Sequence, residues 1–137
     1  MTEDAGERAA ALARQAERAR LGRAAEDLAE SEMARRGHAI VARNLRAPWG
    51  ELDIIARKGR QVVIVEVRSR SLEEGAGPDD DDQPAGGIRE DKRRKVRLTA
   101  QRWLDGRPID YDEVRMFVVL VWWGQCKPTL RVIEDAF

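Results

Sequence analysis

The sequence has little cysteine, few aromatic residues and no long apolar segment. Its single cysteine, Cys126, cannot form an intrachain disulfide or, alone, a thiolate metal cluster. No stretch reaches the apolar length that a membrane-spanning helix needs. The first twenty residues are charged throughout and lack the apolar centre of a secretory signal. We therefore expect a cytoplasmic protein with no membrane segment.

Charge is abundant but balanced, since 25 Lys and Arg residues offset 25 Asp and Glu residues. A net charge of zero says nothing about a polyanionic partner, so only the local distribution of charge can indicate one. The length of 137 residues suits one domain and is too short for two ordinary ones.

Hydrophobic periodicity predicts a helix over residues 1–36, ended by Gly37. Its first twenty residues carry little apolar material beyond alanine, so they form a charged helical extension that can fray or stay disordered. From Leu21 onward the apolar arc strengthens, and residues 21–137 are predicted to form the domain.

Short β-branched and alternating runs follow, separated by turn residues. They predict strands at 38–44, 51–57, 61–69, 114–123 and 129–133, with a turn at 46–50 and a second helix at 89–104. The order α-β-β-β-α-β-β indicates an α/β fold with a mixed sheet of four to five strands flanked by helices. Residues 71–87 are predicted to form a flexible loop, and its Asp79–Asp82 run is interpreted as solvated charge.

The second and third predicted strands form a hairpin around a Lys-Gly-Arg turn. A loop made of residues 59–60 sets Asp53 opposite Glu66, whereas a loop made of residues 58–59 sets Glu51 opposite Glu66. Either register places two carboxylates directly across from each other, which normally destabilises a sheet. A metal ion between them, or a shared proton, would remove the conflict.

A solvated face is the alternative interpretation of these acids, with Arg68 and Arg70 balancing their charge without a metal. The opposite face of the strand at 51–57 is predicted to carry Leu52, Ile54 and Ala56, because side chains alternate along a strand.

Several motifs resemble the YraN-like family of uncharacterised bacterial proteins. These are GELDIIA at Gly50–Ala56, VIVEVRSR at Val63–Arg70, and GRAAEDLA at Gly22–Ala29, which matches a Gly-x-x-Gly-Glu-x-x-Ala pattern with alanine replacing the second glycine. A lysine on the second helix, the AQRWL that ends this helix and the closing Asp-Ala-Phe match as well. The resemblance covers Leu21 to the C-terminus. It implies a restriction-endonuclease-like fold, similar to that of archaeal Holliday junction resolvases.

Nucleases of that fold carry an acid on the first helix, an Asp at a strand start, and Glu-x-Lys on the next strand. Carried over by the resemblance, these positions fall on Glu26, Asp53, Glu66 and Arg68. Mg²⁺, or Mn²⁺ in its place, would be held by Asp53, Glu66 and the Val67 carbonyl, with Glu26 holding a water on the metal or a second ion. Such an ion lowers the pKa of water and neutralises charge that develops on a phosphodiester.

Arg68 stands where the nuclease motif has lysine. Arginine stays protonated, so it can stabilise phosphate charge but is a poor base. Lys92 is the candidate to supply an amine from the second helix.

Three other polar or unusual positions are interpreted as structural. Glu32 is expected to be a salt-bridged residue within the apolar arc of the first helix rather than a site acid. Val118 is expected in the core, where the family usually has aspartate. His38 is expected at the surface.

Basic residues crowd the second helix and the end of the strand before it. This pattern suits a solvated helix face and contacts with the phosphates of nucleic acid equally well, and the family resemblance favours the phosphate contacts, with DNA as the expected partner. The candidates are Arg68, Arg70, Lys92, Arg93 and Lys95. The expected function is a Mg²⁺-dependent endonuclease, with branched or damaged DNA among its candidate substrates. A non-catalytic nucleic-acid-binding protein of the same fold and a protein-interaction module with a relic site are the alternatives. Cutting both strands often needs a second copy, so a homodimer is compatible with this reading, although no residue indicates one.

Overall fold

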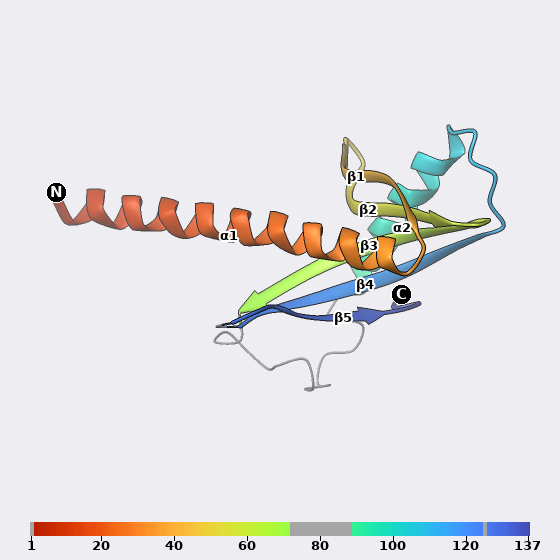
Figure 1. Cartoon of the computed structure of the whole chain (residues 1–137). Coiled ribbons are helices and arrows are strands. Elements are labelled where there is room, and N and C mark those ends of the chain that lie inside the picture. Colours follow the sequence, from red (N-terminus) through yellow and green to blue (C-terminus); the bar gives the residue numbers. More distant parts are fainter. Residues whose placement is uncertain (1, 72–88, 125) are drawn as a thin grey trace.

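The computed structural model of the chain describes residues 2–71, 89–124 and 126–137. The elements follow the predicted order, so the α/β prediction is confirmed (Figure 1). They are α1 Thr2–Arg35, β1 Ala39–Ala47, β2 Gly50–Lys58, β3 Gln61–Ser71, α2 Glu90–Asp105, β4 Glu113–Trp123 and β5 Thr129–Ile133. The predicted turn at 46–50 is shorter than expected, because β1 continues through Ala47 and leaves only Pro48 and Trp49 between the strands.

The predicted loop at 71–87 lies outside the described residues except for Ser71, which ends β3. The Asp79–Asp82 run lies outside them as well. Within the described part of the chain, no helix combines the length and the apolar character needed to cross a bilayer.

The five strands form one mixed sheet in the order β1-β2-β3-β4-β5. Strands β1, β2 and β3 form an antiparallel meander, and β5 runs antiparallel to β4. Strands β3 and β4 are parallel, with α2 in the connection between them. Parallel neighbours need such a crossover, because a tight turn can only join antiparallel strands.

The two helices cover opposite faces of the sheet, and the alternation along β3 shows this most simply. Val63 and Val65 pack in one core cluster with residues of α1, whereas Val62 and Ile64 pack in a second cluster with residues of α2. The α1 residues are Ala25, Ala29 and Met33, and the α2 residues are Val96, Ala100, Trp103 and Leu104. Val118 of β4 is fully buried, which confirms its predicted place in the core.

Strand β2 departs from simple alternation near its start. Leu52 packs in the cluster beside α2, whereas Ile54 and Ala56 pack in the cluster beside α1. The prediction that these three residues share one face is therefore wrong at Leu52. The observed pairing of β2 with β3 reaches only to Ile54, and a two-stranded ribbon twists more strongly than a wider sheet.

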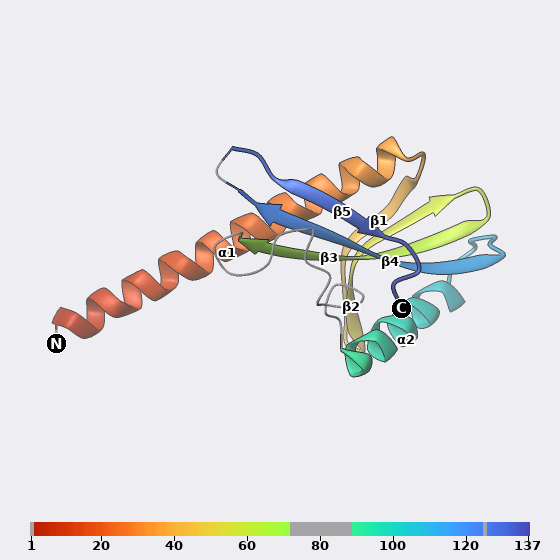
Figure 2. The ribbon, with the colours of Figure 1, turned by 90° about the horizontal axis from the view of Figure 1, so that it is seen from below.

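The first part of α1 projects well beyond the sheet (Figures 1 and 2). The side chains of residues 4–20 are exposed, and burial begins near Leu21. The boundary at which the sequence pattern strengthens is thus the point at which α1 meets the strands.

A close backbone approach fixes the β1–β2 turn against α2. A Cβ atom built on Gly50 would overlap the Thr99 side chain, meeting its Oγ1, Cβ and Cγ2 atoms together. Rotation of Thr99 would move Oγ1 away but would leave its Cβ atom 3.2 Å from the added Cβ, so alanine at position 50 would push the turn away from α2.

Replacing Gly50 with alanine should therefore lower the free energy of unfolding by about 1–3 kcal/mol, the usual cost of overpacking a filled site. Gly22→Ala is the matched control, because a Cβ there meets nothing within 4 Å and alanine favours a helix. Urea denaturation measures both variants. Equal stability of Gly50→Ala and the wild type would contradict the close approach.

Candidate functional site

The hairpin register brings Asp53 and Glu66 together. Lys58 pairs with Gln61, so residues 59–60 form the loop, and the pairing continues to Ile54 with Val65. One further step of the same register sets Asp53 opposite Glu66. Of the two registers that the sequence allowed, the structure has this one, and Glu51 does not face Glu66.

The Asp53 side chain bonds directly to the β3 backbone. The Val67 N–H donates a hydrogen bond of 2.8 Å to Asp53 Oδ2. The N–H and C=O groups of one residue in a strand point to the same neighbouring strand. The Val67 carbonyl therefore also points to the side where Asp53 lies.

Burial and like charge act together on Asp53. Burial raises the pKa of Asp53 to about 7, and the charges of Glu66 and Glu26 add to the rise. The hydrogen bond from the Val67 N–H and the positive charge of Lys92 oppose it. Glu66 is only 6% exposed. The pair is therefore a site where negative charge is held out of water and would attract a cation.

Lys92 already supplies one positive charge. Its Nζ atom lies 2.7 Å from Glu66 Oε1 and is carried by the start of α2. The structure thus brings Lys92 to the site acids, as its predicted role requires. A pocket of about 470 Å³ opens here, and its lining includes Asp53, Glu66, Lys92 and Lys95.

The other predicted phosphate-contacting residues are more spread out. Arg68 and Arg70 are half-buried on β3 and make no ion pair with the described residues, and neither lines this pocket. Arg93 lies 4.0 Å from Glu90 on the same helix. Of the five predicted phosphate contacts, only Lys92 and Lys95 line the pocket.

Glu26 lies near the site but is held by an arginine that the sequence did not single out. Arg43 of β1 pairs with Glu26 at 3.5 Å, with Asp27 at 2.6 Å and with Glu30 at 2.7 Å. Glu26 acts on Asp53 through its charge alone, because no hydrogen bond joins these two described residues. Only a weak signal in the sequence pointed to Arg43. It is an arginine in a predicted strand, and the helix before that strand carries acids about one turn apart.

The remaining sequence interpretations concern structural residues. Glu32 forms ion pairs with Arg35 and Arg36, and the hydrogen bond from Arg35 is the main cause that lowers the pKa of Glu32 to about 2. The prediction of a salt-bridged structural residue is confirmed. His38 is half-buried, with Nδ1 3.2 Å from the Met33 carbonyl and its ring edge toward Phe117. It is thus more enclosed than the surface position that we expected, because the chain turns back under the end of α1.

The donor set fits a hard divalent cation. Mg²⁺ needs one or two carboxylates and keeps several waters, and the site offers Asp53, Glu66 and the nearby Val67 carbonyl. No group of three His, Cys, Asp or Glu residues in the described part of the chain is arranged to hold a metal by side chains alone. A softer metal that needs nitrogen or sulfur ligands therefore has no support here.

Comparisons with known proteins place the same segments in one family. A family model described as "Uncharacterised protein family UPF0102" matches residues 25–121. A UPF0102 protein of Rhodococcus jostii is 36% identical over 118 residues, which cover 85% of this chain and 95% of that relative. One of Moorella thermoacetica is 34% identical over 122 residues, covering 88% and 97%. One of Dechloromonas aromatica is 41% identical over 87 residues, covering 64% and 68%.

The raised pKa of Asp53 makes stability depend on pH. The unfolded chain releases this proton near pH 3.8, whereas the folded chain keeps it until about pH 7. The folded state binds more protons between these values, so stability falls as the pH rises through this window and is level above it.

Asp53→Asn should remove most of this fall, on the order of a few kcal/mol, because an amide oxygen can still accept the Val67 N–H but carries no charge. Urea denaturation at a series of pH values tests this, with the exposed Glu51→Gln on the same strand as control. Parallel curves for the wild type and Asp53→Asn would refute the assignment.

Removing the Lys92 charge should move the pKa of Asp53 further up. In Lys92→Gln the two carboxylates lose their nearest cation, so the Asp53 proton leaves above about pH 7. A ¹³C NMR titration of the carboxyl groups measures the change. Lys95→Gln is the control, because Lys95 lines the same pocket but makes no ion pair with a described residue. An unchanged Asp53 titration in Lys92→Gln would disprove the electrostatic link.

Proposed function

The chain belongs to the UPF0102 family, the YraN-like family that its motifs resemble, and from this premise we propose that it is a metal-dependent nuclease. It would hydrolyse phosphodiester bonds of nucleic acid, with DNA as the favoured substrate. The observation that carries the proposal is the pairing of Asp53 with the buried Glu66 at this pocket, where Lys92 forms an ion pair with Glu66 and no ion pair joins Asp53 to a described residue.

That arrangement is costly for a protein that uses it only as structure. Two neighbouring carboxylates held out of water repel each other, and burial together with the charge of Glu66 raises the pKa of Asp53. A divalent cation bound by Asp53, Glu66 and the Val67 carbonyl would reverse it. When bound, Mg²⁺ would lower the pKa of a water molecule and neutralise the charge that develops on the phosphate.

The surrounding residues have matching roles in this proposal. Asp53 and Glu66 hold the ion, and Glu26 adds negative charge from α1. Arg68 has no acid partner among the described residues, so its guanidinium is available to a phosphate oxygen. Arginine does not lose its proton, so Lys92 is the amine that could hold or move a proton at the site.

Cationic side chains at the start of α2 support nucleic acid as the substrate. Lys95 lines the pocket beside Lys92 and adds positive charge next to the acids. A cationic surface beside a metal-binding acid pair fits a protein that holds the sugar-phosphate backbone. Branched or damaged DNA belongs to this proposal as a substrate class. One site per chain would require a homodimer to cut both strands.

Nucleic-acid binding without cleavage is the second candidate, and the Lys92–Glu66 ion pair favours it. An ammonium 2.7 Å from Glu66 offers a resident counter-ion in place of a metal. With arginine in place of the usual lysine at position 68, the fold could keep binding and lose hydrolysis.

The test is incubation of the purified chain with branched, duplex and single-stranded DNA, with and without Mg²⁺ or Mn²⁺. Glu66→Gln should lower cleavage by about 10³-fold or more, because charge stabilisation of several kcal/mol is lost. The control Glu7→Gln removes an exposed carboxylate on the part of α1 beyond the sheet, outside this pocket, and should cleave like the wild type. Binding without cleavage would support the second candidate, and no binding at low salt would refute both and favour a protein-interaction module.

A further inference from the structure

Four large apolar side chains of the described residues are exposed, and Trp49 is the aromatic one among them. It is 43% exposed, whereas Trp103 and Trp122 are 7% and 6% exposed. Trp123 is half-buried, and its indole N–H donates to Ser69 Oγ. An indole ring left at the surface keeps part of its flat apolar face available for stacking.

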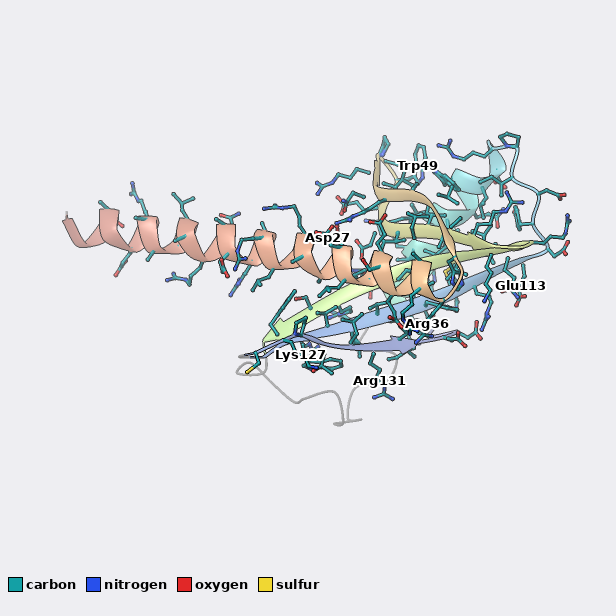
Figure 3. All side chains as sticks on the ribbon, viewed as in Figure 1. Asp27, Arg36, Trp49, Glu113, Lys127 and Arg131 are labelled. Atoms are coloured by element: carbon teal, nitrogen blue, oxygen red, sulfur yellow. The ribbon has the colours of Figure 1, made fainter. Side chains whose placement is uncertain are left out.

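The turn that carries Trp49 is held in place on both sides. Pro48 precedes it and fixes its own backbone φ angle, and Gly50 follows it and lies against Thr99 of α2. Figure 3 shows Trp49 at the end of the β1–β2 hairpin, away from the strands of the sheet. The indole is thus presented by a short, anchored turn, which keeps the entropy cost of binding low.

A stripe along α2 connects this turn to the acid pair. Lys92, Lys95, Thr99 and Arg102 are spaced by three and four residues, so they share one side of the helix. Thr99 is buried under the turn, whereas the three cations are exposed. Lys92 contacts Glu66, Lys95 lines the pocket, Thr99 contacts the turn, and the Arg102 guanidinium lies 5.8 Å from the centre of the Trp49 ring.

The length of this α2 stripe matches a few nucleotides. The ten steps from position 92 to position 102 of the helix span about 15 Å, and a B-form strand advances roughly 3.4 Å per nucleotide. Arg102 makes no ion pair with a described residue, so its charge is available beside the ring. A strand with one phosphate near the acids could therefore reach Trp49 with a base only a few nucleotides away.

We propose that Trp49 stacks on an unpaired nucleobase while the phosphates of the same strand contact the exposed cations of the α2 stripe and pass beside the turn that covers Thr99. The substrate class would then be nucleic acid with a single-stranded segment beside the scissile position. The proposal rests on the proposed nuclease function and narrows it. Bases inside a duplex have both faces covered by neighbours, so an aromatic side chain stacks on bases that are unpaired or at the end of a stack.

Stacking by Trp49 can be distinguished from phosphate binding by its dependence on the form of the DNA. Lysine and arginine side chains hold single-stranded and duplex backbones alike, whereas the ring adds affinity for the single strand only. Loss of the ring should consequently weaken binding of the single strand and leave binding of the duplex nearly unchanged.

The experiment measures the affinity of the full chain for fluorescein-labelled oligodeoxythymidylate and for its duplex with oligodeoxyadenylate, by anisotropy with Ca²⁺ in place of Mg²⁺. Trp49→Ala should weaken single-strand binding on the order of tenfold and change duplex binding less than about twofold, the limit expected if the ring adds nothing there. Trp49→Phe should keep most of the affinity, because a phenyl ring also stacks. Leu12→Ala, which removes an exposed apolar side chain far along α1, should behave like the wild type.

A second measurement reports stacking itself. Tryptophan fluorescence of the wild type should be quenched by the unlabelled single strand, and Trp49→Phe should lose most of this quenching while it still binds. Wild-type affinity in Trp49→Ala, an equal loss for both DNA forms, or full quenching in Trp49→Phe would overturn the stacking role but leave the nuclease proposal intact. A wild-type chain that binds neither form at low salt would overturn both.

Discussion

The hydrogen bond from the Val67 N–H to Asp53 marks the point where β2 separates from β3, and the geometry of the site depends on this separation. At this point the Asp53 carboxylate accepts the hydrogen bond from the Val67 N–H. If β2 and β3 stayed paired further along, a backbone carbonyl of β2 would accept it instead. The β1–β2 ribbon can then twist toward α2, where Gly50 meets Thr99. The pocket lies between that ribbon and the start of α2. Asp53 is thus a structural residue of the hairpin and also one wall of the site.

The same arrangement explains why a chain with no net charge can hold a charged site. Asp53 and Glu66 face Lys92 on the α2 side, while Glu26, Asp27 and Glu30 surround Arg43 at α1. Each group has more acids than bases, and burial strengthens the interactions of Glu66, whereas Asp27 is 68% exposed. The balance of charge over the whole sequence is made elsewhere, by cations such as Arg68, Arg70 and Lys95 that form no ion pair with a described residue. Local excess rather than total charge therefore decides what the site can bind.

Much of the fold could be predicted from local patterns, because strand alternation and turn residues act over a few positions. The hairpin count gave the pairing of Asp53 with Glu66 among two alternatives, and only the strand pairing decided between them. The face of Leu52 and the partners of Arg43 could not be predicted. Both depend on how a ribbon twists and where a helix lies across it, and these are properties of the packed chain. The contact of Lys92 with Glu66 joins residues on separate elements, so only the resemblance to a family pointed to Lys92.

The parallel pairing of β3 with β4 also has a consequence for the order of folding. The β2–β3 hairpin closes over a two-residue loop, but Gln61 and Glu113 at the start of the parallel pair are 52 residues apart. Contacts at that separation must first overcome the entropy of closing a long loop, so they form slowly. Glu66 is therefore expected to remain hydrated through early folding and to lose its water only when α2 docks. The enclosure of the site becomes a late kinetic event, separate from the early formation of the strands that carry its acids.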